Sequence, residues 1–208
     1  MALVDRLAPL LSRHRTRIIG PGWDRLRRKD LLEPFIRSRS GKTTIAEWIE
    51  KRLLERNLRV ERLDGDSVRT SLTKDLGFSK EDRLAHIERV AFVARLLTKH
   101  DVIVLASFIS PYREMRERCR RLISPFAEVY VKCPLEECIR RDVKGLYARA
   151  LKGEIRDFTG ISAPFEEPRH PDLILNTDVE EPEESASKVI AYLERNGYIP
   201  AAGGGESL

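Results

Sequence analysis

The chain has 208 residues, of which 41% are hydrophobic and 34% are charged. This length corresponds to one generous domain or two small ones, and no apolar run approaches the roughly 18 residues that a membrane-spanning helix needs. The composition therefore excludes a disulfide-dependent mini-protein, a disordered chain and a transmembrane protein, and we expect no membrane partner.

The excess positive charge of the chain is concentrated at its amino end. Residues 1–40 hold 10 of the 38 Lys and Arg residues and 4 of the 33 Asp and Glu residues, a net charge of +6, whereas the rest of the chain has a net charge of −1. Affinity for a nucleic-acid backbone requires clustered, uncompensated cations. We therefore expect no nucleic-acid partner for the main domain.

The cysteines and the amino end indicate an intracellular protein. Cys119, Cys133 and Cys138 are odd in number and form neither a CxxC pair nor a disulfide framework, so reduced thiols are expected. The amino end is rich in arginine but also contains acidic residues, and it lacks the apolar core of a secretory signal. These features predict a cytoplasmic location.

From residue 41 onward, helical and strand patterns alternate, as a parallel sheet covered by helices requires. Apolar residues at helical spacing predict helices at 43–56, 81–100, 112–122, 135–141 and 182–196. Apolar runs predict strands at 58–63, 102–106, 127–131 and 172–176, and the unbroken run 102–106 is expected to be buried on both faces. The pattern predicts an α/β fold of three layers with a parallel sheet of about five strands.

Two further segments have weak periodicity. Residues 142–171 are polar, contain several glycines and prolines, and offer no clear core face, so we expect a mobile lid there. Residues 201–208 are rich in glycine and are expected to form a flexible tail.

Residues 1–39 do not follow this alternation. A phosphate-binding α/β domain should begin with a buried apolar strand, but the residues before the glycine loop include Glu33 and Pro34, and proline breaks a central strand. We hypothesise that 1–39 is an atypical basic segment that is disordered or read from a shifted frame, followed by a P-loop domain at 40–200. The alternative is a basic tail that docks a partner or an anionic surface.

A phosphate-binding motif opens the first predicted helix. The residues Ser40, Gly41, Lys42, Thr43 and Thr44 match the end of the P-loop pattern G-x-x-x-x-G-K-[ST]. In that motif backbone N–H groups at the helix start bind phosphates, the lysine neutralises the β and γ oxygens, and the threonine hydroxyl binds Mg²⁺. The tetrapeptide GKTT alone is a weak signal, but the helix, strand and DGD that follow it predict a P-loop NTPase fold that binds ATP with Mg²⁺.

Several motifs together make the chain resemble the adenylylsulfate (APS) kinases over about residues 40–200. They are GKTTIA at 41–46, LDGDSVR at 63–69, DLGFSKEDR at 75–83, ISPYR at 109–113 and KGLYARALKGEIRDFTGISAPFEEP at 144–168. The resemblance implies ATP-dependent phosphorylation of the 3′-hydroxyl of adenosine 5′-phosphosulfate (APS) in sulfate assimilation. It also admits a homodimer and an association with ATP sulfurylase.

The resemblance assigns catalytic roles to residues of three motifs. Asp66 and Lys42 are expected to act in catalysis. Asp66 would accept the proton of the 3′-hydroxyl or hold Mg²⁺ together with Thr43, and Asp64 would support Asp66. Ser110 is expected to donate a hydrogen bond during direct transfer, with a phosphoserine intermediate as the alternative. Taken alone, the DGD sequence could also be a polar turn that caps the next helix.

The resemblance also assigns the substrate contacts. Arg69 and Arg83 are expected to bind the phosphosulfate, and Phe78 and Phe165 to sandwich the adenine. The alternatives without a binding role are that the arginines are solvated on a helix surface and that the phenylalanines pack in the core. The remaining expected contacts are His86, Ile109, Lys144 and Leu146 for APS and Arg141 near the base of ATP.

Some residues depart from the family pattern. Ile36 and Arg39 stand where the family loop has glycines, and a side chain at a left-handed position costs about 1–2 kcal/mol. After Arg83 the family usually has a Glu-Asn pair and then a second arginine, and here these places are taken by Ala85, His86 and Glu88. Glu88 puts a carboxylate where a positive charge would favour binding of an anion. His86 could equally lie on the surface.

These observations predict an adenylylsulfate kinase. Two alternatives stay open: a catalytically weak relative that binds the sulfonucleotide or a partner because its P-loop is degraded, and a P-loop kinase for another small hydroxylated substrate.

Overall fold

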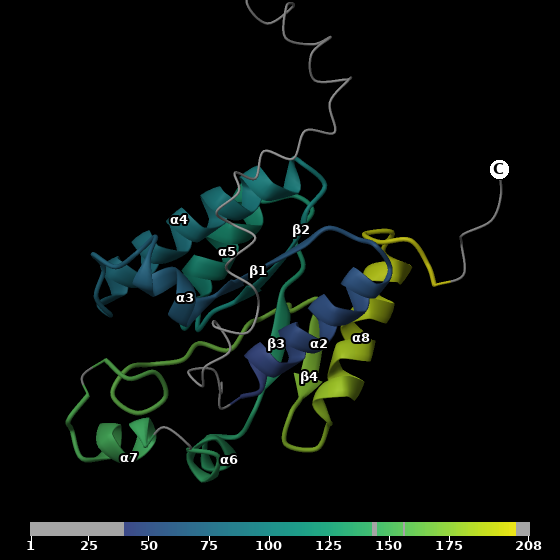
Figure 1. The fold of residues 1–208 in the computed structure, drawn as a ribbon. Helices are drawn as coiled ribbons and strands as arrows, with labels where there is room; N and C mark the ends of the chain where they lie inside the picture. Colours follow the sequence, from purple (N-terminus) through teal and green to yellow (C-terminus); the bar gives the residue numbers. More distant parts are fainter. Residues whose placement is uncertain (1–39, 143–144, 156, 203–208) are drawn as a thin grey trace, which may run out of the picture. The chain divides into compact units, whose positions relative to one another are not determined.

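The computed structural model describes residues 40–142, 145–155 and 157–202. All of them belong to one of the two compact units of the chain, Ile36–Leu208. In order, its elements are α2 (Lys42–Glu55), β1 (Val60–Asp64), α3 (Gly65–Thr70), α4 (Lys80–Thr98), β2 (Ile103–Ser107), α5 (Arg113–Leu122), β3 (Val129–Lys132), α6 (Leu135–Arg140), α7 (Leu146–Leu151), β4 (Leu173–Asn176) and α8 (Pro182–Arg195) (Figure 1).

Helices and strands alternate as the sequence predicts, with boundaries shifted by one or two residues. Two short helices, α3 and α7, were not expected, because six residues are too few for a helical period to show in the sequence. Helix α7 and the buried residues Ala150 and Ala163 lie within the segment expected to be a lid without a core face. Mobility of that segment stays a prediction.

The four described strands form two parallel pairs. Strand β1 pairs with β2, with Val60 opposite Ile103, and β3 pairs with β4, with Val129 opposite Leu173. No hydrogen-bonded ladder joins the two pairs in the described part of the chain. The parallel direction is confirmed, but the described residues contain four strands of the expected five.

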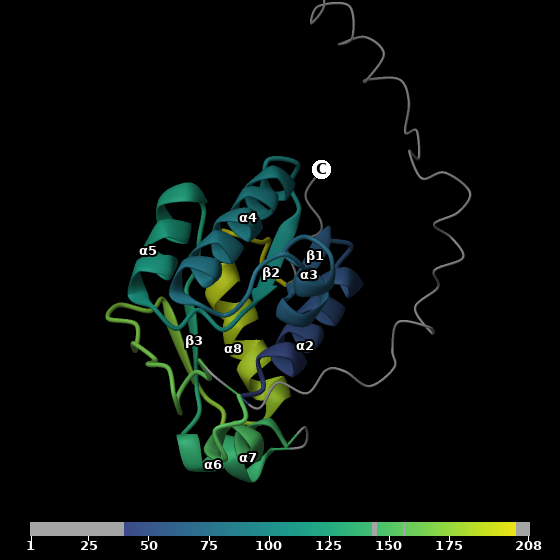
Figure 2. The same ribbon diagram turned by 90° about the vertical axis from the view of Figure 1, so that its left-hand side faces the viewer.

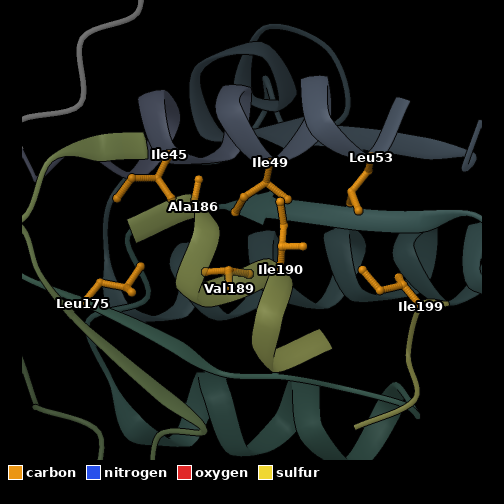
Figure 3. Packing of buried hydrophobic residues seen from close by; sticks show 8 residues of the cluster. All are labelled: Ile45, Ile49, Leu53, Leu175, Ala186, Val189, Ile190 and Ile199. Atoms are coloured by element: carbon orange, nitrogen blue, oxygen red, sulfur yellow. The ribbon is translucent and has the colours of Figure 1, made fainter. Parts of the chain in front are cut away.

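Two helical layers cover the strands (Figure 2). On one side, α2 and α8 form the main core, in which eight buried residues meet: Ile45, Ile49, Leu53, Leu175, Ala186, Val189, Ile190 and Ile199 (Figure 3). On the other side, α4 and α5 pack together, and Ala91, Ala94 and Ile123 form a second cluster with Val104 of β2. Burial of these apolar side chains fixes both helical layers on the strands.

Strand β2 is less buried than the sequence predicts. Ile103, Val104 and Leu105 are only half-buried and Ala106 is exposed, so the expectation of burial on both faces is wrong in the described structure. The physical reason is that, among the described strands, β2 pairs with β1 alone.

Among the described helices, none combines the length and apolar composition that a membrane crossing requires.

Candidate functional site

The start of α2 lies at the carboxyl ends of the strands. The Oγ1 atom of Thr43 in the first turn of α2 donates to Oδ2 of Asp64, the last residue of β1, at 3.1 Å. A Cβ placed on Gly41 would lie 3.8 Å from the side chain of Thr177, which follows β4. Ligands of parallel α/β sheets bind at this edge, so the predicted phosphate motif has the position that its chemistry requires.

The backbone of the phosphate motif depends on a glycine. Gly41 precedes α2 with φ = 81°, in the left-handed region that a residue without Cβ adopts at little cost. No side chain caps this helix start, so the N–H groups of its first turn can bind an anion. Nζ of Lys42 donates to Oγ of Ser40 at 2.5 Å, and burial lowers the pKa of Lys42. A bound phosphate would supply the negative charge that stabilises this buried ammonium group.

Asp64 connects the phosphate motif to the DGD turn. One carboxylate oxygen accepts from Thr43, and the other accepts from the backbone N–H of Asp66 at 3.0 Å and so caps α3. The carboxylate of Asp66 itself is exposed in the first turn of α3. The DGD turn therefore caps the next helix, as one interpretation of the sequence expected, and Asp64 makes the cap. The turn also lies next to the phosphate motif, through the contact between Asp64 and Thr43.

The same residues can hold a divalent cation. The hydroxyl of Thr43 and the carboxylate of Asp64 are hard oxygen donors in contact with each other, and Mg²⁺ in nucleotide sites typically takes one or two carboxylates together with substrate phosphates. The described residues contain no group of three or more His, Cys, Asp or Glu that could form an all-protein metal site. The donor set thus fits a cation that binds with its nucleotide.

Arg69 and Arg83 meet at the ring of Phe78. Their guanidinium carbons lie 4.4 and 5.4 Å from the ring centroid, and Nε of Arg83 donates to the carbonyl oxygen of Phe78 at 2.9 Å. Neither arginine forms an ion pair with another described residue. Burial lowers the pKa of both arginines, and the charge of Arg83 lowers that of Arg69 further. Two guanidinium groups this close together would be stabilised by a bound anion.

His86 is buried, which rules out the surface position that the sequence left open. It is 4% exposed, its Nδ1 lies 2.8 Å from Oγ1 of Thr73, and its ring contacts Phe108 edge to face. Burial, followed by the charges of nearby arginines, lowers the pKa of His86 to about 4. The ring is therefore neutral at neutral pH.

Glu88 does not oppose the anion site in the way the sequence suggested. Its carboxylate forms an ion pair with Arg118 of α5 at 2.6 Å. The pairing offsets the charge of the carboxylate, so the expected repulsion of an anion has no support in the structure.

Ser110 and Phe165 lie at one place beyond the end of β2. The backbone N–H of Glu166 donates to Pro111 at 2.8 Å, and the Ser110 carbonyl oxygen accepts from a nitrogen of Arg116. Phe165 stacks on Tyr130 with centroids 6.1 Å apart. Both Phe78 and Phe165 are substantially exposed, at 55% and 42%, so core packing does not explain either. Ile109 is also 55% exposed.

Arg141 lies next to the phosphate motif. One of its nitrogens donates to the carbonyl oxygen of Thr177 at 2.9 Å, and Thr177 lies close to Gly41, 3.8 Å from where a Cβ on that glycine would be. Leu146 is half-buried at the start of α7. Lys144 lies outside the described residues, so its predicted contact is not placed.

Asp142 organises the start of α7, a role that was not predicted from the sequence. Its carboxylate accepts from the backbone N–H groups of Leu146, Tyr147 and Ala148, at 2.8 to 3.1 Å. An acidic residue a few positions before a helix is a capping signal, but the neighbouring glycine-rich pattern suggested only a loop. Thr73 and Phe108, the neighbours of His86, left no signal because they lie far from it in the chain.

Comparisons with known proteins place the chain in one family. A family model described as adenylylsulphate kinase matches residues 36–176. The adenylyl-sulfate kinase of Halothermothrix orenii is 60% identical over 162 residues, which cover 78% of this chain and 88% of that protein. That of a Picosynechococcus species is 56% identical, with 78% and 92% covered. The structure of the Mycobacterium tuberculosis APS kinase CysC with AMPPNP and APS superposes with a TM-score of 0.73 at 43% identity, covering 76% of this chain and 92% of that one.

Proposed function

The chain belongs to the adenylylsulfate kinase family, and we propose that it transfers the γ-phosphoryl group of ATP to the 3′-hydroxyl of APS, giving ADP and 3′-phosphoadenosine 5′-phosphosulfate. The observation that carries this proposal is the contact between Thr43 and Asp64, which joins the phosphate motif to the DGD turn. We place the reaction in the cytoplasm, in sulfate assimilation, and in residues 40–200.

The ATP phosphates bind at the start of α2. Backbone N–H groups of its first turn, including those of Thr43 and Thr44, face the β and γ oxygens, and Lys42 and Ser40 complete the site. Arg141 lies on the adenine side, beside Thr177 and Gly41. This arrangement places the γ-phosphoryl group next to the DGD turn.

The hydroxyl of Thr43 and the carboxylates of the DGD turn would hold Mg²⁺. When bound, the cation neutralises charge that develops on the transferred phosphoryl group. Asp64 already contacts Thr43, and its second oxygen fixes the backbone of Asp66. The protein therefore sets the position of the Asp64 carboxylate and of the Asp66 backbone before the nucleotide binds.

Asp66 accepts the proton of the 3′-hydroxyl. Its carboxylate is exposed at the start of α3, where the helix N-terminus stabilises negative charge. Ser110, beyond the carboxyl end of β2, donates a hydrogen bond to the reacting groups in a direct, in-line transfer. Positioning and charge neutralisation then provide most of the rate acceleration.

APS binds between the arginine pair and the two exposed aromatic rings. Arg69 and Arg83 bind its phosphosulfate, and Phe78 and Phe165 stack on the adenine, with Ile109, Leu146 and Lys144 completing the contacts. We assign His86 an indirect role: its hydrogen bond to Thr73 ties α4 to the residues after α3. The changed residues near His86 thus give no support to a different hydroxylated substrate.

The test is an assay of the purified full chain with Mg-ATP and APS, measuring ADP and the doubly phosphorylated product. ADP formation that requires APS supports the proposal. Binding of APS without ADP formation would contradict it and would indicate a non-catalytic relative. That second function is favoured by one observation, the replacement of two loop glycines by Ile36 and Arg39.

The loop explanation has its own test. The double substitution Ile36→Gly with Arg39→Gly is expected to tighten ATP binding by roughly 5- to 30-fold, the equivalent of about 1–2 kcal/mol of relieved backbone strain. Calorimetric titration of both proteins with a non-hydrolysable ATP analogue measures the difference. Equal affinities would show that the two side chains do not impair the loop.

A further inference from the structure

One arginine of α5 joins three segments that are far apart in the chain. The guanidinium group of Arg116 donates to the carbonyl oxygen of Ser110, and to that of Glu166 at 2.6 Å. Its Nε forms an ion pair at 2.8 Å with Glu128, which directly precedes β3. We propose that Arg116 is a positioning residue for APS, which holds the segments of Ser110 and Phe165 in the arrangement that binds the substrate.

The role of Arg116 rests on the proposed function, in which Ser110 contacts the reacting groups and Phe165 contacts the adenine. Ser110 follows β2 and Phe165 precedes β4, so no local backbone geometry fixes one relative to the other. Both must keep their spacing to contact a single APS molecule, because a displacement of about 1 Å can cost roughly 100-fold in rate. A group that fastens the two segments together therefore acts on the substrate without touching it.

The backbone already brings these two segments together. The N–H of Glu166 donates to the carbonyl oxygen of Pro111 at 2.8 Å, and the Glu166 carboxylate accepts from the backbone N–H of Arg113 at 2.8 Å. Arg116 adds a bond from its side chain to Ser110 itself and another to Glu166. One guanidinium group thus spans the junction of the two segments.

Arg116 also lies beside the aromatic ring that it is proposed to position. Its guanidinium carbon is 6.0 Å from the ring centroid of Phe165, and that ring stacks on Tyr130 of β3. The ion pair with Glu128 anchors the guanidinium group at the start of the same strand. The side chains of Arg116 and Glu128 are 12% and 15% exposed, so solvent screens the pair little. Phe165 therefore has contacts with both β3 and α5.

The three contacts need the planar fork of an arginine. Three different nitrogens of Arg116 reach the oxygens of Ser110, Glu166 and Glu128. A lysine at this position would keep the charge, but its single ammonium nitrogen on a flexible stem cannot reproduce the fork. Arg116→Lys therefore tests positioning separately from charge.

The first measurement is the affinity for APS of the full chain saturated with a non-hydrolysable ATP analogue, by calorimetric titration. Arg116→Lys should weaken APS binding at least tenfold. Affinity for the ATP analogue should stay within twofold, because none of the contacts of Arg116 described above involves the phosphate motif. Arg118→Lys is the matched control: it alters the same helix and an ion pair of 2.6 Å with Glu88, and it should bind APS within twofold of the unmodified chain.

A double-mutant cycle tests whether Arg116 acts through the ring of Phe165. In the Phe165→Ala background, Arg116→Lys should weaken APS binding less than threefold, because the ring that it positions is already absent. Equal weakening in the two backgrounds would overturn the proposal, since it would show that the effect does not pass through Phe165.

Amide hydrogen exchange tests the same link without any ligand. Arg116→Lys should speed exchange at least tenfold at the amides of 165–167 and leave α2 and α8 unchanged. Unchanged exchange at 165–167, or an equal increase throughout the chain, would overturn the proposal. Normal APS binding by both the unmodified chain and Arg116→Lys would overturn this role alone. Absence of APS binding by the unmodified chain would overturn the proposed function, and the role of Arg116 with it.

Discussion

The two carboxylates of the DGD turn should separate stability from catalysis. Replacing Asp64 by alanine removes the acceptor for the buried hydroxyl of Thr43 and the cap of α3. Each loss is worth about 1 kcal/mol, so the free energy of unfolding should fall by about 2 kcal/mol. For a chain of this size that lowers Tm by about 4–8 °C. Product formation should fall as well, since the contact to Thr43 is lost.

Asp66→Ala should lower activity strongly and stability little. The side chain is exposed on α3, so the free energy of unfolding should change by less than about 1 kcal/mol. Loss of a general base lowers the rate of transfer by about 10²- to 10⁴-fold. Thermal unfolding and ADP release are measured on both variants, with Glu117→Ala, another exposed helical carboxylate, as the control.

Two results would refute this reasoning. Turnover of Asp66→Ala at the rate of the unmodified chain would remove Asp66 from the mechanism. An unchanged Tm for Asp64→Ala would show that its contacts with Thr43 and the backbone of α3 contribute nothing to stability.

Burial holds the pKa of His86 at about 4, below its ordinary 6.5, so the folded chain binds this proton less well than the unfolded chain. The contribution of His86 to stability is present above about pH 6.5 and is lost toward pH 4, by up to about 1.4 kcal/mol per pH unit. In urea unfolding, the free energy of unfolding of His86→Gln should depend less steeply on pH between these values than that of the unmodified chain. Equal slopes for the two proteins would contradict the burial of His86. Phe78→Ala should raise the KM for APS by roughly 5- to 150-fold, the equivalent of about 1–3 kcal/mol of base stacking. Phe92→Ala, at an equally exposed phenylalanine on α4, should leave the KM unchanged. Equal KM values for the two variants would exclude stacking by Phe78. Glu88→Ala should change KM less than about twofold, because Arg118 already neutralises the carboxylate; a large fall in KM for APS would restore the repulsion expected from sequence.

The local elements of this protein follow from its sequence. The helical spacing of Ile45, Ile49 and Leu53 predicts α2 and its buried face, and the same three residues lie in the main core. The GKTT tetrapeptide and the DGD turn are each contiguous in the chain, so both are recognisable in the amino-acid sequence alone, as are the family motifs. The phosphate motif needs only a glycine, a lysine and a helix start, which are short-range features.

Other properties depend on residues that are distant in the chain. Nothing near His86 in sequence indicates that Thr73 and Phe108 will bury it, and nothing near Glu88 indicates that Arg118 of the next helix will pair with it. Strand β2 reads as a central strand because its apolar run is unbroken, yet its burial depends on a neighbour that must come from another segment. The sequence therefore determined the elements and the phosphate chemistry. The tertiary structure decided which charges are paired and which ring is neutral, because these are set by contacts across the fold.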